Sequence, residues 1–351
     1  MDTLTASVVG GGAGGRLSMD ALAASPRFHL VAAADVSPDA RKALTQRYPG
    51  LRIYPDHTSM FRESPTDVVC VSTWPPSHEE VALAALALHL KGILVEKPLG
   101  HTHASGRRIL EAVKARGLPM AVPHGLLSVA APLEIIRRVR AGDIGRLRSV
   151  EIESDKWDIM NAGIHWMNFF LMLAGDDPVE AVMASCESST RTFRDGMQVE
   201  TTAVTCVTTR GGVRAWMVTG DDVAVSAEGK GQLFRIMGTT GSIEYTAWES
   251  HYVIRDARHP APAEVRPEGL AVTGHRRHLE GMADMIGHRP DWSIPESSLA
   301  ALAICEAAYL ASQHRCKVVF PLESFSPPPE PEWNPGAPYS GSGGGRDGRR
   351  L

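Results

Sequence analysis

The stretch ASVVGGGAGG, residues 6–15, decides the fold of the amino-terminal part of the chain. Its first four residues predict a short buried strand, and a helical pattern follows the glycines. The spacing Gly10-x-Gly12-x-x-Gly15 permits a tight turn, close approach of the backbone to a pyrophosphate, and close packing of helix on strand. The helix N-terminus attracts the anion. Taken alone, the glycine motif is weak evidence, because a flexible turn has the same composition.

A second apolar strand, residues 28–34, makes the dinucleotide interpretation specific. It ends in Asp35, twenty positions beyond Gly15. This is the spacing of the carboxylate that bonds to the adenosine ribose hydroxyls of a dinucleotide. Because Asp35 would repel a 2′-phosphate and residues 36–39 contain no arginine, the sequence predicts NAD rather than NADP.

Strands and helices continue to alternate up to residue 122. Strands are expected at residues 67–72, 93–96 and 119–122, and helices at 81–90 and 102–116. Ser77 followed by Glu80 has the pattern of a capping box at the start of the first of these helices. Repeated units of this length predict a doubly wound, parallel α/β sheet.

Polar residues follow directly after the strand at 93–96. Glu96, Lys97 and Pro98 stand at its carboxyl end, where open α/β sheets bind ligands. Pro98 restricts the backbone of Lys97 and admits a cis peptide bond, and either effect would fix the direction of the ammonium group. The alternative is a solvated charge pair that leads into a loop.

These motifs together resemble the Gfo/Idh/MocA family, the relatives of glucose–fructose oxidoreductase and inositol dehydrogenase. The resemblance extends to about Pro321, and Glu96-Lys97-Pro98 is its most specific mark. It implies a nicotinamide cofactor and a role for Lys97 near the substrate hydroxyl. The cofactor-binding residues implied by the motifs and by this resemblance are Gly10, Gly12, Ala13, Gly15, Asp35, Ser72, Thr73, Trp74, Pro75, His78, Glu96 and Lys97.

The character of the chain changes after Val122. Strand-like runs dominate residues 147–245, and in residues 147–153 polar and apolar side chains alternate, as on a half-solvated sheet. The family's second domain is an open, mostly antiparallel α+β sheet that often makes homo-oligomer contacts. We therefore expect an NAD-binding Rossmann domain over 1–123, a substrate and oligomerisation domain over 124–325, and a disordered tail over 326–351 that is rich in proline, glycine and serine.

A second half of the site is expected in the apolar segment 159–171. If this segment is helical, Asn161, His165 and Asn168 form its one polar stripe, spaced i, i+4, i+7. A buried stripe is either bonded internally or borders a cleft. The resemblance favours the cleft, with His165 and Asn161 joining Lys97 as catalytic residues, although relatives carry acids where Asn161 and Asn168 stand. Because Asn161 cannot take a proton, His165 would be the main proton carrier of this segment.

The totals exclude several classes of protein. The 351 residues are 43% hydrophobic and 22% charged, and the net charge of −4 argues against a nucleic-acid or anionic-membrane partner. The amino terminus lacks the pattern of a signal peptide. Five scattered cysteines suit reduced thiols in a cytoplasm. The pairs His101/His103 and His275/His278 have no further ligands at metal-site spacing, so no metal is expected.

The sequence therefore predicts an NAD-dependent dehydrogenase acting on a CH–OH group of a sugar, polyol or cyclitol, assembled as a homodimer or homotetramer. One alternative is a redox-neutral isomerase or lyase that uses tightly bound NAD transiently. A further alternative, a binding protein without turnover, is disfavoured by the presence of Lys97.

Overall fold

The computed structural model describes residues 3–187, 192–326 and 336, and it divides into two compact units. Unit 1 comprises residues 1–128 and 272–299, and unit 2 comprises residues 129–271 and the chain from Ala300 onward. The expected two-domain division missed that residues 272–299 return to unit 1. Of the expected tail, all but Ser326 and Gly336 lies outside the described residues.

Unit 1 is built on a six-stranded sheet in the order β3-β2-β1-β4-β5-β6, in which every neighbouring pair is parallel. The strand order reverses between β1 and β4, which is the switch point of a Rossmann fold. The predicted doubly wound sheet is confirmed. The strands are β1 (Leu4–Val9), β2 (Phe28–Ala34), β3 (Arg52–Tyr54), β4 (Val68–Val71), β5 (Gly92–Val95) and β6 (Met120–Ala121).

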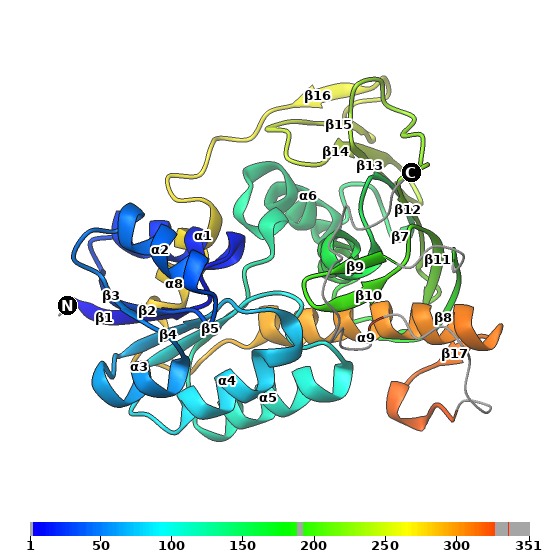
Figure 1. Cartoon of the computed structure of the whole chain (residues 1–351). Coiled ribbons are helices and arrows are strands. Elements are labelled where there is room, and N and C mark those ends of the chain that lie inside the picture. Colours follow the sequence, from blue (N-terminus) through cyan, green and yellow to red (C-terminus); the bar gives the residue numbers. More distant parts are fainter. Residues whose placement is uncertain (1–2, 188–191, 327–335, 337–351) are drawn as a thin grey trace. The chain divides into compact units, whose positions relative to one another are not determined.

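Helices cover both faces of this sheet, with α1 and α8 on one face and α4 and α5 on the other (Figure 1). Helix α8 comes from residues 272–299, and its Leu279, Met282 and Ala283 are buried in the core of unit 1. Burial of a side chain such as Leu279 contributes about 1.5–3 kcal/mol. The helices are α1 (Ala13–Ala24), α2 (Pro38–Arg47), α3 (His57–Glu63), α4 (Pro75–Leu86), α5 (His103–Ala115) and α8 (Gly274–Asp284).

Helix α4 begins two residues earlier than the expected capping box. Trp74 is its N-cap and Pro75 occupies the first helical position, where a fixed φ and a missing N–H suit the start of a helix. The Ser77 hydroxyl instead donates to the carbonyl oxygen of Trp74, at 2.9 Å, and to the Thr73 hydroxyl, also at 2.9 Å. The capping box predicted there is therefore wrong.

Unit 2 contains a nine-stranded sheet in the order β16-β15-β14-β13-β7-β12-β11-β8-β17. Strands β7 and β12 pair in parallel and the other described neighbours pair antiparallel, which confirms the predicted open, mostly antiparallel sheet. Its strands are β7 (Leu147–Asp155), β8 (Val179–Cys186), β11 (Thr202–Thr209), β12 (Arg214–Gly220), β13 (Gln232–Gly238), β14 (Ser242–Thr246), β15 (Tyr252–Arg255), β16 (Ala263–Val265) and β17 (Val318–Val319); β9 (Thr192–Arg194) and β10 (Met197–Val199) form a separate pair.

Two helices of unit 2 pack on the buried face of this sheet and on each other, α6 (Ala130–Ala141) and α7 (Ile164–Ala174). The core here is aromatic: Phe234 of β13 makes edge contacts with Trp166 and Phe169 of α7, each at 5.4 Å between ring centroids. Helix α9 (Ser293–His314) is long and apolar enough to cross a membrane, but 61% of its most apolar window is buried inside the protein, as is usual for a core helix. Two 3₁₀ helices cover Gly125–Ser128 and Leu322–Ser324.

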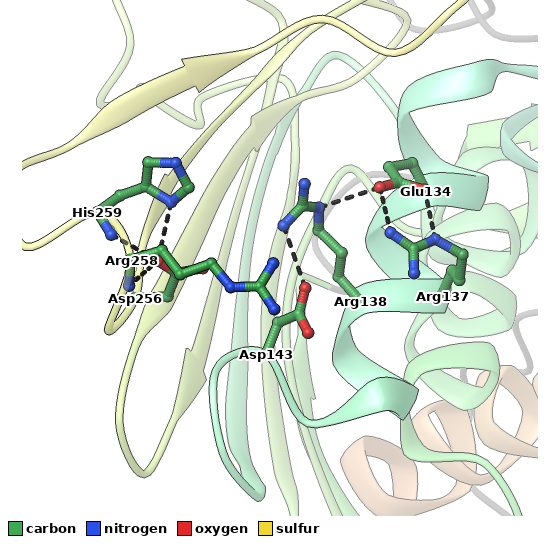
Figure 2. Close-up of polar contacts among 7 residues, drawn as sticks. All are labelled: Glu134, Arg137, Arg138, Asp143, Asp256, Arg258 and His259. Carbon is green, nitrogen blue, oxygen red and sulfur yellow. Dashed lines mark hydrogen bonds and ion pairs between the residues drawn. The ribbon is translucent and has the colours of Figure 1, made fainter.

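Charged side chains of unit 2 gather around the end of α6 (Figure 2). Arg137 and Arg138 both donate to Glu134, and Arg138 also donates to Asp143, at 3.1 Å. Nearby, the Asp256 carboxylate accepts from the backbone N–H groups of residues 258 and 259 in the turn after β15. These ion pairs and turn bonds fasten the helix end and the turn.

Candidate functional site

The glycine turn joins β1 to α1 and leaves the first turn of that helix open. Gly10 has a φ of +103°, and a Cβ there would collide with the backbone carbonyl of Ser72. A Cβ at Gly15 would collide with the carbonyl of Gly10, so helix and strand approach this closely because neither residue has a side chain. Gly12 is the N-cap, and it has no side chain to bond to the N–H groups of the first turn. These N–H groups fit a pyrophosphate.

Asp35 stands at the end of β2 with both carboxylate oxygens fixed by the backbone. Its Oδ2 accepts from the N–H of Gly11 at 2.6 Å, and its Oδ1 accepts from the N–H of Ser37 at 2.7 Å. The guanidinium of Arg41 donates to the carbonyl oxygens of Asp35 and Val36, at 2.8 and 2.9 Å, and so holds this loop. A carboxylate oxygen accepts more than one hydrogen bond, so Asp35 remains able to bind ribose hydroxyls.

A pocket of about 460 Å³ opens at the switch point between β1 and β4. Six predicted cofactor residues line it: Gly10, Gly12, Asp35, Ser72, Thr73 and Trp74. The glycine turn, the anchored carboxylate and the mostly apolar wall together fit a dinucleotide. The remaining described residues of the lining are Val9, Ala34, Val36, Ser37, Ala40, Asp56, His57, Ser77, Glu80 and Val81.

The other six predicted cofactor residues lie outside this lining. Ala13 and Gly15 belong to the first turn of α1, and Pro75 begins α4. His78 is completely buried, and its ring nitrogens face the carbonyl oxygens of Thr73, at 2.9 Å, and Pro98, at 3.0 Å. His78 thus joins the loop after β4 to the loop after β5, and its role at the cofactor stays a prediction.

Lys97 follows β5, the neighbour of β4 in the sheet, and is half-buried. The Lys97–Pro98 peptide bond is cis, one of the two conformations that the sequence admits. The residue thus stands at the carboxyl edge of the sheet, one strand away from the strand end that lines the pocket.

Glu96 is buried beneath the same edge and bonds to a residue that sequence reasoning set aside. Its Oε1 lies 2.6 Å from Nε2 of His275, on α8. Burial raises the pKa of Glu96, but the hydrogen bond from His275 and the charges of His275 and Lys97 lower it more, so its pKa lies below the ordinary value. The same carboxylate packs against Gly14 of α1. Glu96 therefore connects the carboxyl edge of the sheet to both α1 and α8.

A second contact ties α8 to the chain after β6. The ring of His278 bonds through Nε2 to the carbonyl oxygen of His124, at 3.1 Å, and Nε2 of His124 lies 2.8 Å from the hydroxyl of Ser298. Burial lowers the pKa of His278 to about 4 and holds the pKa of His124 well below its ordinary value. Both rings are therefore neutral at pH 7.

In unit 2, the predicted polar stripe of residues 161–168 begins in a π-helical turn, Ile159–Gly163, and α7 starts only at Ile164. Asp158 caps this turn: its Oδ1 accepts from the backbone N–H of Asn161 at 2.7 Å. The side-chain amide of Asn161 donates to both oxygens of Asp158, at 3.0 and 3.1 Å. Arg194 donates to the same carboxylate at 3.2 Å. Asn161 is thus part of an internally bonded cluster, and the prediction of one continuous helical stripe is wrong.

A second buried acid supports the same turn. Glu200 is 2% exposed; its Oε1 accepts from the N–H of Ile159 at 2.6 Å, and its Oε2 accepts from the hydroxyl of Tyr309 at 2.7 Å. Burial, and then the nearby charge of Asp158, raise the pKa of Glu200 to about 7. The turn before α7 thus rests on two carboxylates, one of which titrates near neutrality.

His165 lies on α7 and is half-buried, whereas Asn168 is buried. The His165 ring makes an edge contact with Trp248, at 6.5 Å between centroids. Trp248 is 51% exposed and has a φ of +72°, a conformation that bulky residues rarely adopt and that concentrates at functional sites. His165 therefore stands beside an exposed indole. Among the residues that the structure describes, no group of three histidine, cysteine or acidic side chains is placed to hold a metal ion.

Two family models match the chain in order. The model for the oxidoreductase family with the NAD-binding Rossmann fold matches residues 4–124, and the model for the Gfo/Idh/MocA carboxyl-terminal domain matches residues 158–244. Together they cover more than half of the chain. The chain belongs to the Gfo/Idh/MocA family. Its residues 4–124 are the NAD-binding domain of that family, which confirms the predicted cofactor class.

Relatives in this family include inositol 2-dehydrogenases. The enzyme of Acidothermus cellulolyticus is 40% identical over 88 residues, which are 25% of this chain and 26% of the relative. That of Burkholderia multivorans is 31% identical over 164 residues, 43% of this chain and 48% of the relative. The matched segments thus span from about a quarter to about half of these relatives.

Solved structures of the family share the fold over nearly the whole chain. An aldose–aldose oxidoreductase from Caulobacter crescentus, complexed with glycerol, has a TM-score of 0.76 at 21% identity, covering 91% of this chain and 100% of that one. An oxidoreductase from Agrobacterium radiobacter, in complex with NAD⁺, L-tartaric acid and magnesium, has a TM-score of 0.75 at 17% identity, covering 91% of this chain and 98% of that one.

The structure shows contacts near the candidate site for several residues of this Gfo/Idh/MocA chain that the sequence did not point to. Arg41 lies two positions beyond residues 36–39, whose lack of arginine favoured NAD. His275 carries no local sign of its role, because its partner, Glu96, lies 179 positions away in the sequence. Asp158 precedes the predicted helix, and an Asp three residues before the polar Asn161 was the available sign of a cap.

Proposed function

We propose that the protein is an NAD-dependent oxidoreductase that transfers a hydride between a CH–OH group of a sugar, polyol or cyclitol and the nicotinamide. The observation that carries this proposal is the pocket at the switch point, with an open helix N-terminus at one end and Asp35 anchored beside it. Bound NAD supplies the hydride acceptor; the protein supplies binding, orientation and a path for the proton.

Lys97 is the residue that takes or gives the proton of the reacting hydroxyl. A half-buried lysine at the carboxyl edge of a Rossmann sheet lies where such sheets bind their ligands. Positioned acids and bases typically contribute about 100- to 10,000-fold to a rate. Glu96, which His275 holds buried, keeps the backbone before Lys97 in place.

In unit 2, we assign His165 as a second proton-carrying residue. We assign Asn161 as a residue that holds the π-helical turn, Ile159–Gly163, from which α7 and His165 continue. The exposed indole of Trp248 beside His165 supports a substrate with an apolar C–H face, because small-molecule sites combine aromatic walls with a few placed polar groups. The inositol 2-dehydrogenase relatives support the sugar and polyol class. Neither the described contacts nor the relatives favour a redox-neutral use of NAD.

A second copy of the chain is the proposed partner, docked on the outer face of the nine-stranded sheet. Met183, Val204 and Trp216 are 52%, 43% and 39% exposed there. Cys206 lies directly opposite both Met183 and Trp216 in the register, so these side chains form one apolar row. We expect Trp216→Glu to shift the assembly toward monomers in sedimentation; an unchanged oligomer would exclude this face.

We also propose a reducing compartment, the cytoplasm. All five cysteines, Cys70, Cys186, Cys206, Cys305 and Cys316, are free thiols. This is usual where glutathione and thioredoxin keep thiols reduced.

The direct test is turnover. The full-length protein is incubated with NAD and, separately, NADP, against a panel of cyclitols, polyols, aldoses and sugar acids, while nicotinamide absorbance is followed. We expect stoichiometric NADH formation with at least one polyhydroxylated substrate. Loss of substrate without net NADH, or binding of NAD with no turnover across the panel, would contradict the proposal.

A further inference from the structure

The lining of the pocket includes residues that are not assigned to phosphate or ribose binding. If the glycine turn takes the pyrophosphate and Asp35 the ribose, the base attached to that ribose lies beyond Asp35. This step rests on the proposed function. Among these residues are two exposed apolar side chains, Val36 at 81% and Trp74 at 64%, which offer surface to the faces of a planar base.

The lining also includes the polar side chains of His57 and Glu80. His57 is the first residue of α3, which Asp56 caps, and its ring packs edge-on against Phe61, at 5.6 Å between centroids. Glu80 comes from α4. Nε2 of His57 and Oε1 of Glu80 are 3.9 Å apart, within ion-pair distance but too far for a hydrogen bond, so a ring nitrogen and a carboxylate lie side by side on two residues of the lining.

We propose that His57 and Glu80 recognise the edge of the adenine base. The carboxylate of Glu80 accepts a hydrogen bond from the 6-amino group, and the ring N–H of His57 donates to the adjacent ring nitrogen. Adenine presents a donor next to an acceptor along this edge, and the same complementarity lets one side-chain amide bond to adenine with both its groups. The pair makes the site selective for adenine over a 6-oxo purine.

The selectivity follows from the chemistry of the base. Hypoxanthine carries a carbonyl oxygen in place of the amino group and an N–H in place of the acceptor at position 1. The carbonyl would face the carboxylate of Glu80, and two acceptors cannot bond to each other. Because the Glu80 side chain is 75% exposed, water weakens this discrimination, and we expect about tenfold rather than the larger factors of enclosed sites.

The test is equilibrium binding to the full-length, nucleotide-free protein, measured by calorimetry with NAD and with nicotinamide hypoxanthine dinucleotide. Wild type should bind NAD about tenfold more tightly, and Glu80→Ala should reduce this preference to about twofold. His57→Phe, which keeps an aromatic ring against Phe61, should also narrow it. Glu79→Ala is the matched control, because Glu79 neighbours Glu80 on α4 but pairs with Arg108 outside the pocket.

Each remaining outcome has a definite meaning. Equal binding of the two dinucleotides by wild type, or an unchanged preference in Glu80→Ala and His57→Phe, would overturn the adenine reading while leaving dinucleotide binding intact. Loss of the preference in Glu79→Ala would also overturn it, because the effect would then not depend on the pocket-lining acid. Binding of neither dinucleotide would contradict the proposed function itself.

Discussion

The pocket of unit 1 and the buried cluster before α7 in unit 2 use the same residue types in opposite ways. At the pocket, Asp35 is fixed by backbone N–H groups and still borders an open space. Before α7, Asp158 and Glu200 are 5% and 2% exposed, and their bonds run to Asn161, Arg194, Tyr309 and the backbone.

The two sites therefore differ in role: one can bind a ligand, whereas the other stabilises the local fold. A carboxylate held by the backbone at the border of a pocket keeps lone pairs for a ligand, whereas buried carboxylates that are bonded from all sides define a local conformation. We therefore expect substitutions in unit 1 to change binding and rate, and substitutions in the cluster of unit 2 to change stability and its pH dependence.

The largest effect is expected at Lys97. Lys97→Ala should lower kcat by about 100- to 10,000-fold if Lys97 is the proton-transfer group that we propose. The Kd for NAD should stay within about threefold, because the pocket lining does not include this residue. Lys91→Ala is the control: Lys91 precedes β5 and pairs with Asp67 at 2.9 Å, far from the carboxyl edge. Near-normal turnover of Lys97→Ala would reduce Lys97 to a surface charge.

The next largest effect is expected in the buried carboxylate cluster before α7. Asn161→Asp places a carboxylate about 3 Å from that of Asp158, in a cluster that already contains Glu200. We expect a loss of about 3 kcal/mol of unfolding free energy at pH 8, because one buried charge is left uncompensated. The loss should shrink as the pH falls, since the coupled carboxyl groups take up a proton. Asn161→Ala, which removes the bonds without adding charge, should cost about 1–2 kcal/mol. An Asn161→Asp variant as stable as wild type would contradict the view that this cluster supports the local conformation.

Part of the fold and of the candidate site can be predicted from the sequence. The parallel sheet, the glycine turn, Asp35 and the position of Lys97 follow from local patterns: apolar runs, glycine spacing and the residue after a strand. Such patterns involve neighbours in sequence, and the structure preserves them.

The missed features depend on contacts between distant segments. Nothing near His275 signals Glu96, and nothing near Asp158 signals Glu200 or Tyr309. The period of 3.6 residues also failed at Asn161, because a π-helical turn shifts the faces before α7 begins. The membership of helix α8 in unit 1 depends on packing that no local pattern records.

A smaller effect is expected on the preference for NAD over NADP when Asp35, in the pocket of unit 1, is replaced. Asp35→Ser should weaken NAD binding about tenfold by removing a charged hydrogen-bond acceptor, and should improve NADP binding relative to wild type. Arg41, whose guanidinium lies 2.8 Å from the carbonyl oxygen of residue 35, then supplies positive charge beside the ribose. The ratio of the two Kd values measures this, with Asp39→Ser on α2 as the control. A wild type that prefers NADP would contradict the role of Asp35.

The smallest effect concerns Glu200 and its raised pKa. Between pH 4.5 and about 7 the folded protein holds this proton more tightly than the unfolded chain does, so the Glu200 contribution to stability falls as the pH rises through that window. Glu200→Gln removes the titration while its amide keeps an acceptor for the N–H of Ile159. Relative to wild type, the variant should therefore gain about 1–2 kcal/mol on going from pH 5 to pH 8.

Urea unfolding of both proteins at the two pH values measures this difference. His278, whose pKa burial lowers to about 4, contributes in the opposite direction in both proteins and cancels in the comparison. Glu180→Gln, at an exposed position of β8, should show no such change. If Glu200→Gln follows wild type at both pH values, Glu200 is ionised throughout and the bonds from Ile159 and Tyr309 outweigh its burial. The cluster before α7 would then be a fixed ionic support rather than one that loosens as the pH rises.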